Sequence, residues 1–180
     1  MSTIAGTDRP AVEAPGAPER RRRRAAIARR LLAGSAQAAA ALDWDTLDRA
    51  PAWLGWSDDA LAIFQCRIGA VLCAPVLRLW IDGARLGAAR DALGESFLHA
   101  LLAQHDGPSL RDAAPRVDAA ERVAPALQAA GASVLLATLP ESPLRRCAGA
   151  ALGSATPLAI APELARELVT RAATLAEQMS

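Results

Sequence analysis

The chain has 180 residues, of which 52% are hydrophobic but only 3% are aromatic, with no Tyr. This length fits one domain. Its apolar residues include much Ala and Leu, which favour helices, and few of the residues that favour strands, so the composition argues strongly against an all-β fold. We therefore predict an all-α protein, an irregular bundle of six to seven helices with a disordered N-terminal arm.

Charge is distributed unevenly along the chain. The formal net charge is +1, yet residues 20–30 contain seven Arg and no acidic residue, so the rest of the chain carries −6. An acidic body does not suit a protein that coats nucleic acid, and we expect no nucleic-acid partner. The three Cys are odd in number and widely spread, which predicts no disulfide framework and favours a reducing, cytoplasmic location.

No segment has the sequence of a membrane span, which needs roughly 20 apolar residues in succession. The best candidate, residues 60–77, carries Gln65 and Arg67 in its middle and Pro75 near its end. A charge at the centre of a bilayer is costly. We expect a buried helix here and no transmembrane segment.

The N-terminal part of the chain has two regions. Residues 1–18 contain three Pro and two Gly without periodicity, which predicts a disordered leader before a single helical domain at 19–180. An Arg-rich first helix is expected over 19–42. The apolar residues that recur there at helical spacing are Ile27, Leu31, Ala38 and Leu42.

The next part is expected to hold the central helix. Residues 43–56 are typical of a structured loop or a short helical turn, capped by Asp45. Ser57 is a suitable N-cap, followed by two acidic residues in the first turn. The segment 58–73 is apolar on nearly all sides, as in a helix at the centre of a bundle. Pro75 is predicted to break it.

Gly, Pro and capping residues divide the remainder into short helices. A polar connection is expected over 106–117. Asp118 and Glu121 have the spacing of a capping box, which would open the next helix. The predicted helices are a short one through Trp80, one that ends at Leu93, one from about 97 to 104, one from 118 to 139, one over 143–152 and a last one from Pro162.

The residues that could carry chemistry form no catalytic or metal-binding pattern. Cys66 and Cys73 are seven apart on one face of an apolar helix, and Cys147 is distant. His99 and His105 are six apart and do not share a helix face. Structural zinc needs ligands in closely spaced pairs, and no nucleophile with a base and an orienting group is recognisable. We predict buried Cys, no metal, no cofactor, no catalytic residue and no enzymatic activity.

A run of five Arg is the strongest local signal. It consists of Arg20, Arg21, Arg22, Arg23 and Arg24. One interpretation is a peripheral module that binds phosphate or an anionic membrane surface through this arm. The other is a solvated arm that aids solubility or has a weak auxiliary role. No aromatic residue alternates with these Arg, unlike in a platform that stacks nucleic-acid bases.

Three of the four Trp lie between residues 44 and 56. A candidate protein-binding site consists of these three residues, Trp44, Trp53 and Trp56, and of the acidic pair that follows them, Asp58 and Asp59. Trp surrounded by charge is typical of interface hot spots. The alternative is that these rings attach the segment to the bundle, because large aromatic side chains are mostly buried.

Two segments resemble a known family. Residues 66–83 read CRIGAVLCAPVLRLWIDG, followed by Leu86, RDALG at 90–94 and FL at 97–98. Residues 127–146 contain Gly131, LL at 135–136, LP at 139–140 and LRR at 144–146. Over residues 57–150 the chain resembles the type III secretion accessory proteins of the SctK/YscK group, relatives of the oxygen-regulated invasion protein OrgA. In that family an IDG…L…LR..LG stretch precedes a G…LL…LP..LRR stretch.

The resemblance implies a non-enzymatic cytosolic adaptor. Members of the family belong to the sorting platform beneath the injectisome, at the cytosolic base of the secretion apparatus. They link the cytoplasmic domain of the inner-membrane ring protein to the pod protein of the platform. These two proteins are therefore the expected partners. No individual binding residue carries over, because the shared motifs have the pattern of packing positions.

Overall fold

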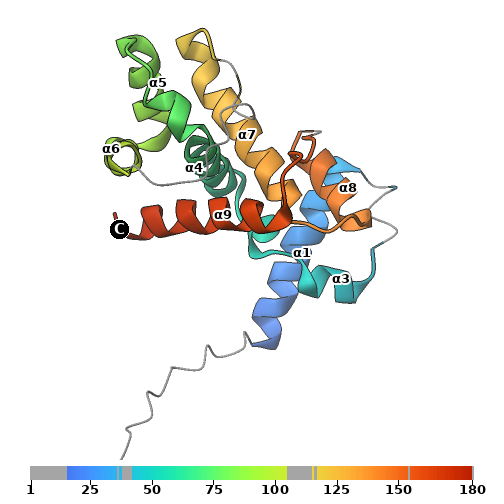
Figure 1. Ribbon diagram of the computed structural model, residues 1–180. Coiled ribbons are helices and arrows are strands. Elements are labelled where there is room, and N and C mark those ends of the chain that lie inside the picture. Colours follow the sequence, from blue (N-terminus) through green and yellow to red (C-terminus); the bar gives the residue numbers. More distant parts are fainter. Residues whose placement is uncertain are drawn as a thin grey trace, which may run out of the picture.

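The computed structural model describes residues 16–35, 37, 42–104, 115, 117–153 and 155–179. Every regular element in these residues is helical, which confirms the all-α class (Figure 1). Eight α-helices are described, against six to seven predicted. The α-helices are α1 (Ala17–Gly34), α3 (Trp44–Arg49), α4 (Asp58–Leu77), α5 (Gly83–Leu93), α6 (Glu95–Ala103), α7 (Val123–Ala137), α8 (Pro143–Ala151) and α9 (Pro162–Glu177), and two 3-10 helices are η1 (Ala52–Gly55) and η3 (Ala120–Arg122).

The core is built around α4, as its apolar sequence predicts. Eleven of the twenty α4 residues are buried. Helix α7 packs along α4, and α9 contacts both helices (Figure 1). Gly69 of α4 faces Leu127 of α7, whereas Gln65, one turn earlier, faces Gly131, one turn later. The two central helices are therefore antiparallel.

Helix α4 also has the length and composition of a membrane span, with a mean hydropathy of 1.9. In the structure, 61% of its most apolar stretch is buried against the rest of the protein. Gln65 is buried with it, and its Oε1 accepts a hydrogen bond from Gln128 Nε2 at 3.2 Å. Helix α4 thus occupies the place of the buried helix that the sequence predicts.

The first helix differs from the prediction at both ends. It begins at Ala17, inside the predicted leader, and ends at Gly34 instead of Leu42, because Ser35 has an extended backbone. A Cβ at Gly34 would lie 2.4 Å from the backbone nitrogen of Ala151, so α1 meets the end of α8 at backbone contact. The predicted residues that lie outside the described part of the chain are 1–15 of the leader and 36 and 38–41 of the helix.

Pro75 does not break α4, contrary to the prediction. The helix continues to Leu77, and the Arg78 N–H still donates to the Ala74 carbonyl at 3.1 Å. A proline this close to the end removes one helical hydrogen bond, and the buried Leu77 side chain holds the last turn in the core. The separate short helix predicted through Trp80 is a turn instead.

Several predicted helix ends are confirmed. Ser57 caps α4, and its Oγ accepts a hydrogen bond from the backbone at the third residue beyond it. Ser142 caps α8 in the same way, with Pro143 at the first helical position. Gly94 ends α5 with a φ of 83°, a backbone conformation that favours glycine.

The predicted capping box at Asp118 and Glu121 is wrong. The 3-10 helix η3 forms there, and Asp118 pairs with Arg122 at 3.4 Å. Helix α7 begins only at Val123, which leaves Pro125 in the first turn. A start at the capping box would put this proline inside the helix, where it has no N–H to donate and its ring clashes with the preceding turn. The polar connection predicted over 106–117 lies outside the described residues except at 115 and 117.

Candidate functional site

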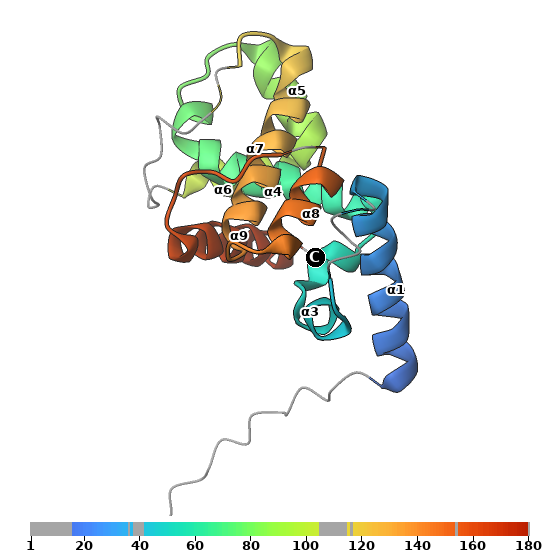
Figure 2. The same ribbon diagram turned by 90° about the vertical axis from the view of Figure 1, so that its right-hand side faces the viewer.

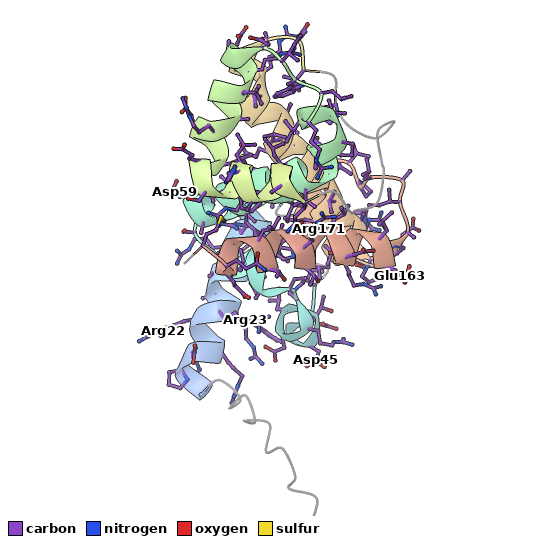
Figure 3. The ribbon with its side chains drawn as sticks, turned by 60° about the vertical axis from the view of Figure 1, so that its left-hand side comes forward. Arg22, Arg23, Asp45, Asp59, Glu163 and Arg171 are labelled. Carbon is purple, nitrogen blue, oxygen red and sulfur yellow. The ribbon has the colours of Figure 1, made fainter. Side chains whose placement is uncertain are left out.

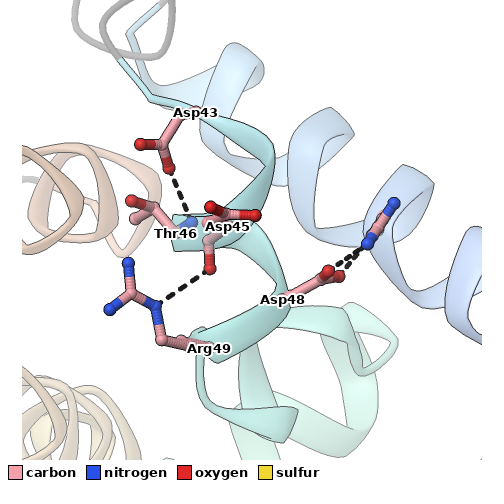
Figure 4. Close-up of polar contacts among 6 residues, drawn as sticks. Asp43, Asp45, Thr46, Asp48 and Arg49 are labelled. Carbon is pink, nitrogen blue, oxygen red and sulfur yellow. Dashed lines mark hydrogen bonds and ion pairs between the residues drawn. The ribbon is translucent and has the colours of Figure 1, made fainter.

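Arg side chains fasten α1 to the segment that follows it. Arg24 donates two hydrogen bonds to the carboxylate of Asp48 on α3, through Nε and Nη2 (Figure 4). Arg23 Nη2 donates to the carbonyl oxygen of Ala50. The contact with Asp48 raises the pKa of Arg24 and lowers the pKa of Asp48, and the charge of Arg20 lowers the pKa of Asp48 further.

A second link joins α1 to the start of α4. Arg30 Nη2 donates to the Trp56 carbonyl and to Asp58 Oδ1, both at 2.6 Å. The Arg30 side chain is 12% exposed, whereas that of Asp58 is 97% exposed. The arginine is therefore part of the packed junction, and the aspartate stays at the surface.

The segment after α1 forms a true helix, α3, with its own cap. Asp43 is the N-cap in place of the predicted Asp45, and its Oδ1 accepts the Thr46 N–H at 2.7 Å (Figure 4). Hydrogen bonds from Thr46 hold the pKa of Asp43 below its usual range. Arg49 Nε donates a hydrogen bond to the Asp45 carbonyl oxygen at 3.2 Å, within the same helix.

The predicted run of five Arg does not act as one unit. Arg23 and Arg24 dock on the protein, whereas Arg21 and Arg22 are exposed. Figure 3 shows Arg22 and Arg23 leaving α1 on opposite sides. Arg29 is exposed as well, and it lies seven residues after Arg22, on the same outward stripe of the helix. Helix α1 thus has an inner side of docked cations and an outer side of solvated ones.

The three Trp of the candidate binding site lie in different environments. Trp53 is 7% exposed and belongs to the core, so it is a packing residue, contrary to its predicted binding role. Trp56 is 40% exposed, and its ring makes an edge-type contact with that of Phe64 at a centroid distance of 5.0 Å. Trp44 is 67% exposed and borders, with Leu32, a hollow of about 160 Å³ between α1 and α3. Burial thus separates Trp53, which attaches the segment to the bundle, from Trp44 and Trp56, whose rings are exposed.

An exposed apolar and acidic surface lies at the start of α4. Trp56 lies two residues before this helix, and Ile63 in its second turn is 49% exposed. Asp59 is exposed four residues before Ile63, so the two side chains share a helix face. We name Trp56, Asp59 and Ile63 the Trp56 patch. Asp58 lies beside it and is engaged by Arg30.

A second exposed surface lies beyond the other end of α4. Leu79 is 63% exposed and Ile81 is 97% exposed, in the link to α5. The link is held in place because Arg78 donates to carbonyls at the end of α6, and Arg85 stacks over the Trp80 ring at 5.1 Å. We name Leu79 and Ile81 the Ile81 patch. The sequence predicts no site here, although two aliphatic residues stand beside a turn signal.

The Cys side chains are placed for packing. Cys66, Cys73 and Cys147 are all buried, as predicted. Burial raises the pKa of each thiol, that of Cys73 to about 12. At neutral pH they are protonated and weak nucleophiles. His99 is exposed on α6, His105 lies outside the described residues, and no group of three metal-ligating side chains occurs in the described ranges.

The residues that carry the family resemblance lie mostly in the core. Leu93 and Phe97 of the first stretch are buried, as are Leu127, Leu135 and Leu136 of the second. Most of the shared positions are therefore packing positions, whereas the IDG stretch at 81–83 is exposed. No protein-family model, no curated protein and no solved structure matches this chain.

Proposed function

We propose that this protein is a non-enzymatic adaptor of a type III secretion apparatus. It links the cytoplasmic domain of an inner-membrane ring protein to the pod protein of the cytoplasmic sorting platform. Its place is the cytoplasm, at the base of the apparatus. The resemblance of residues 57–150 to the SctK/YscK group supports the family, and the all-α fold is compatible with it.

The observation that carries the proposal is the position of the two exposed patches. Helix α4 has 20 residues, and a helix rises 1.5 Å per residue, so its ends are about 30 Å apart. The Trp56 patch lies at its first turns, and the two residues of the Ile81 patch lie two and four residues after its last residue, Leu77. Two apolar surfaces at opposite ends of the central helix suit two partners bound at the same time.

The two patches also differ in chemistry. The Trp56 patch joins an aromatic and an aliphatic side chain to the carboxylate of Asp59, which favours a basic partner surface with an apolar pocket. The Ile81 patch is purely aliphatic, and Ile81 is almost fully exposed. We therefore expect each patch to select a different partner protein.

Paired substitutions at the patches test this assignment. One variant carries Trp56→Ala and Ile63→Ala, and the other carries Leu79→Ser and Ile81→Ser. Each should lower the affinity for one partner at least tenfold and leave the other within about twofold, since hot-spot residues cost about 2 kcal/mol or more when truncated. Titration calorimetry with the full chain measures both affinities.

Each variant serves as the matched control for the other. Because all four side chains are at least 40% exposed, thermal melts should show both variants folded. If both folded variants bind both partners as the parent does, the patches are not the adaptor surfaces. If the parent protein binds neither partner at moderate salt, the proposed adaptor function itself is wrong.

A further inference from the structure

The outer side of α1 carries charge that the fold does not use. Arg21, Arg22 and Arg29 are exposed, and no hydrogen bond or ion pair joins them to another described residue. By contrast, the inner arginines of the same helix bind Asp48, Asp58 and backbone carbonyls. The outer cations can be removed without breaking a described contact.

These cations share one surface with an apolar side chain. Arg22 and Arg29 lie on one stripe of α1, and Leu32 lies on the adjacent stripe, three residues after Arg29. Leu32 is 52% exposed. We name Arg21, Arg22, Arg29 and Leu32 the α1 outer face. The acidic residues of α3 lie toward its other side: Figure 3 shows Arg22 and Asp45 on opposite sides of α1.

The shape of this region matches a flat target. In Figure 2, α1 stands at the edge of the molecule, and its N-terminal half extends past the helical bundle. A plane can therefore touch the outer face along the helix without meeting the rest of the protein. None of the hollows described in the structure contains Arg21, Arg22 or Arg29, whereas Leu32 borders the hollow between α1 and α3.

We propose that the α1 outer face binds anionic lipid bilayers. Guanidinium groups with a neighbouring Leu suit the headgroup region, where the cations meet lipid phosphates and the Leu side chain enters the acyl boundary. A row of cations on one helix surface, none of which lines a hollow, favours this planar target over an acidic protein. Nucleic acid is disfavoured because no aromatic side chain lies between the arginines. This inference does not depend on the partner proteins.

Flotation of the full chain with vesicles tests the proposal. The vesicles are phosphatidylcholine alone, or phosphatidylcholine with about a third of phosphatidylglycerol. We expect binding only to the anionic vesicles, weakened by added salt. Replacing Arg21, Arg22 and Arg29 by Gln should reduce the partition coefficient by roughly a hundredfold, given the usual contribution of each basic residue near such a surface.

A second triple variant is the control for net charge. It replaces Arg122, Arg146 and Arg166 by Gln, three exposed arginines outside α1. This variant should bind anionic vesicles within a few fold of the parent. Equal loss in both triple variants, or equal binding of neutral and anionic vesicles, would overturn the proposal. So would binding to an acidic peptide or to DNA at salt concentrations where the vesicles are not bound.

The adaptor function and the lipid surface can fail separately. The outer-face triple variant should still bind both partner proteins, because it leaves the Trp56 and Ile81 patches intact. Loss of partner binding in this variant, with vesicle binding unchanged, would reassign the face to a protein and overturn the lipid proposal. Loss of vesicle binding alone supports it.

Discussion

Gly69 of α4 and Gly131 of α7 form a reciprocal pair at the crossing of the two central helices, each facing the backbone of the other helix. A Cβ at Gly69 would lie 1.9 Å from the Leu127 carbonyl oxygen, and one at Gly131 would lie 1.9 Å from the Gln65 carbonyl oxygen. Each glycine thus lets the backbone of the other helix approach to contact distance. This helix crossing holds α4 in place, and with it both exposed patches.

A methyl group at this crossing should be severely destabilising. Gly69→Ala and Gly131→Ala should each lower the free energy of unfolding by about 3 kcal/mol or more, because backbone has to move to make room. Gly87→Ala is the matched control: it lies inside α5 with no atom within 4 Å of the added Cβ, and should raise stability by about 0.5–1 kcal/mol. Urea unfolding followed by circular dichroism measures all three. If Gly69→Ala and Gly131→Ala left the free energy of unfolding nearly unchanged, the described packing of α4 against α7 would be contradicted.

The buried Cys should differ in their tolerance of serine. Cys73→Ser places a hydroxyl at a site 4% exposed and should cost about 1–3 kcal/mol. Cys66→Ser should cost less, because Cys66 Sγ already lies 3.8 Å from the Ala124 carbonyl, which a hydroxyl can use as an acceptor. Thiol labelling of the native parent near pH 8 should be very slow, since all three thiols are buried and Cys73 has a pKa of about 12. The reverse order of cost would show that this face of α4 is not packed as described.

The contact between Arg24 and Asp48 should depend on acid pH. The pKa of Asp48 is lowered in the folded state, so its contribution to stability is present above the unfolded-state pKa and is lost as the pH falls through the lower folded-state value. A double-mutant cycle of Arg24→Gln and Asp48→Asn should give a favourable coupling free energy at pH 7 that declines below about pH 4. A coupling free energy that is the same at pH 7 and below about pH 4 would show that no ion pair forms.

The Trp residues should separate into a packing residue and surface residues. Trp53→Ala should lower the free energy of unfolding by about 3–5 kcal/mol, because the ring is almost fully buried. Trp44→Ala should change it by no more than about 0.5 kcal/mol, as is usual for exposed sites. Chemical unfolding followed by circular dichroism gives both values. Similar losses in the two variants would place Trp44 in the core as well.

Local sequence signals predicted much of the fold. The N-cap at Ser57, the Ser142–Pro143 start of α8 and the Gly94 stop act within one turn, so they can be read from neighbouring residues. Tertiary contacts decided the rest. Helix α1 ends at Gly34 where it meets the backbone of α8, and Leu77 holds the turn after Pro75 in the core.

The candidate site was predictable only in part. The Arg run and the Trp cluster stood out by composition, but sequence alone could not tell which members face inward. Trp53 turned out to be buried, and Arg23 and Arg24 are fastened to the segment after α1. The role of Gly131 at the helix crossing could not be predicted without knowing which helix packs against it. The Ile81 patch could not be predicted because the sequence marks this link only as a turn and does not show that its side chains are exposed.

Formation of a ternary complex tests the adaptor function most directly. Sedimentation velocity of the full chain, mixed with the cytoplasmic domain of the ring protein and with the pod protein, reports whether all three travel together. We expect one species that contains all three proteins, and we expect that changes at the Trp56 or the Ile81 patch each remove a single partner from it. Binding of neither protein, or binding of the two only in competition, would contradict an adaptor with a separate surface at each end of α4.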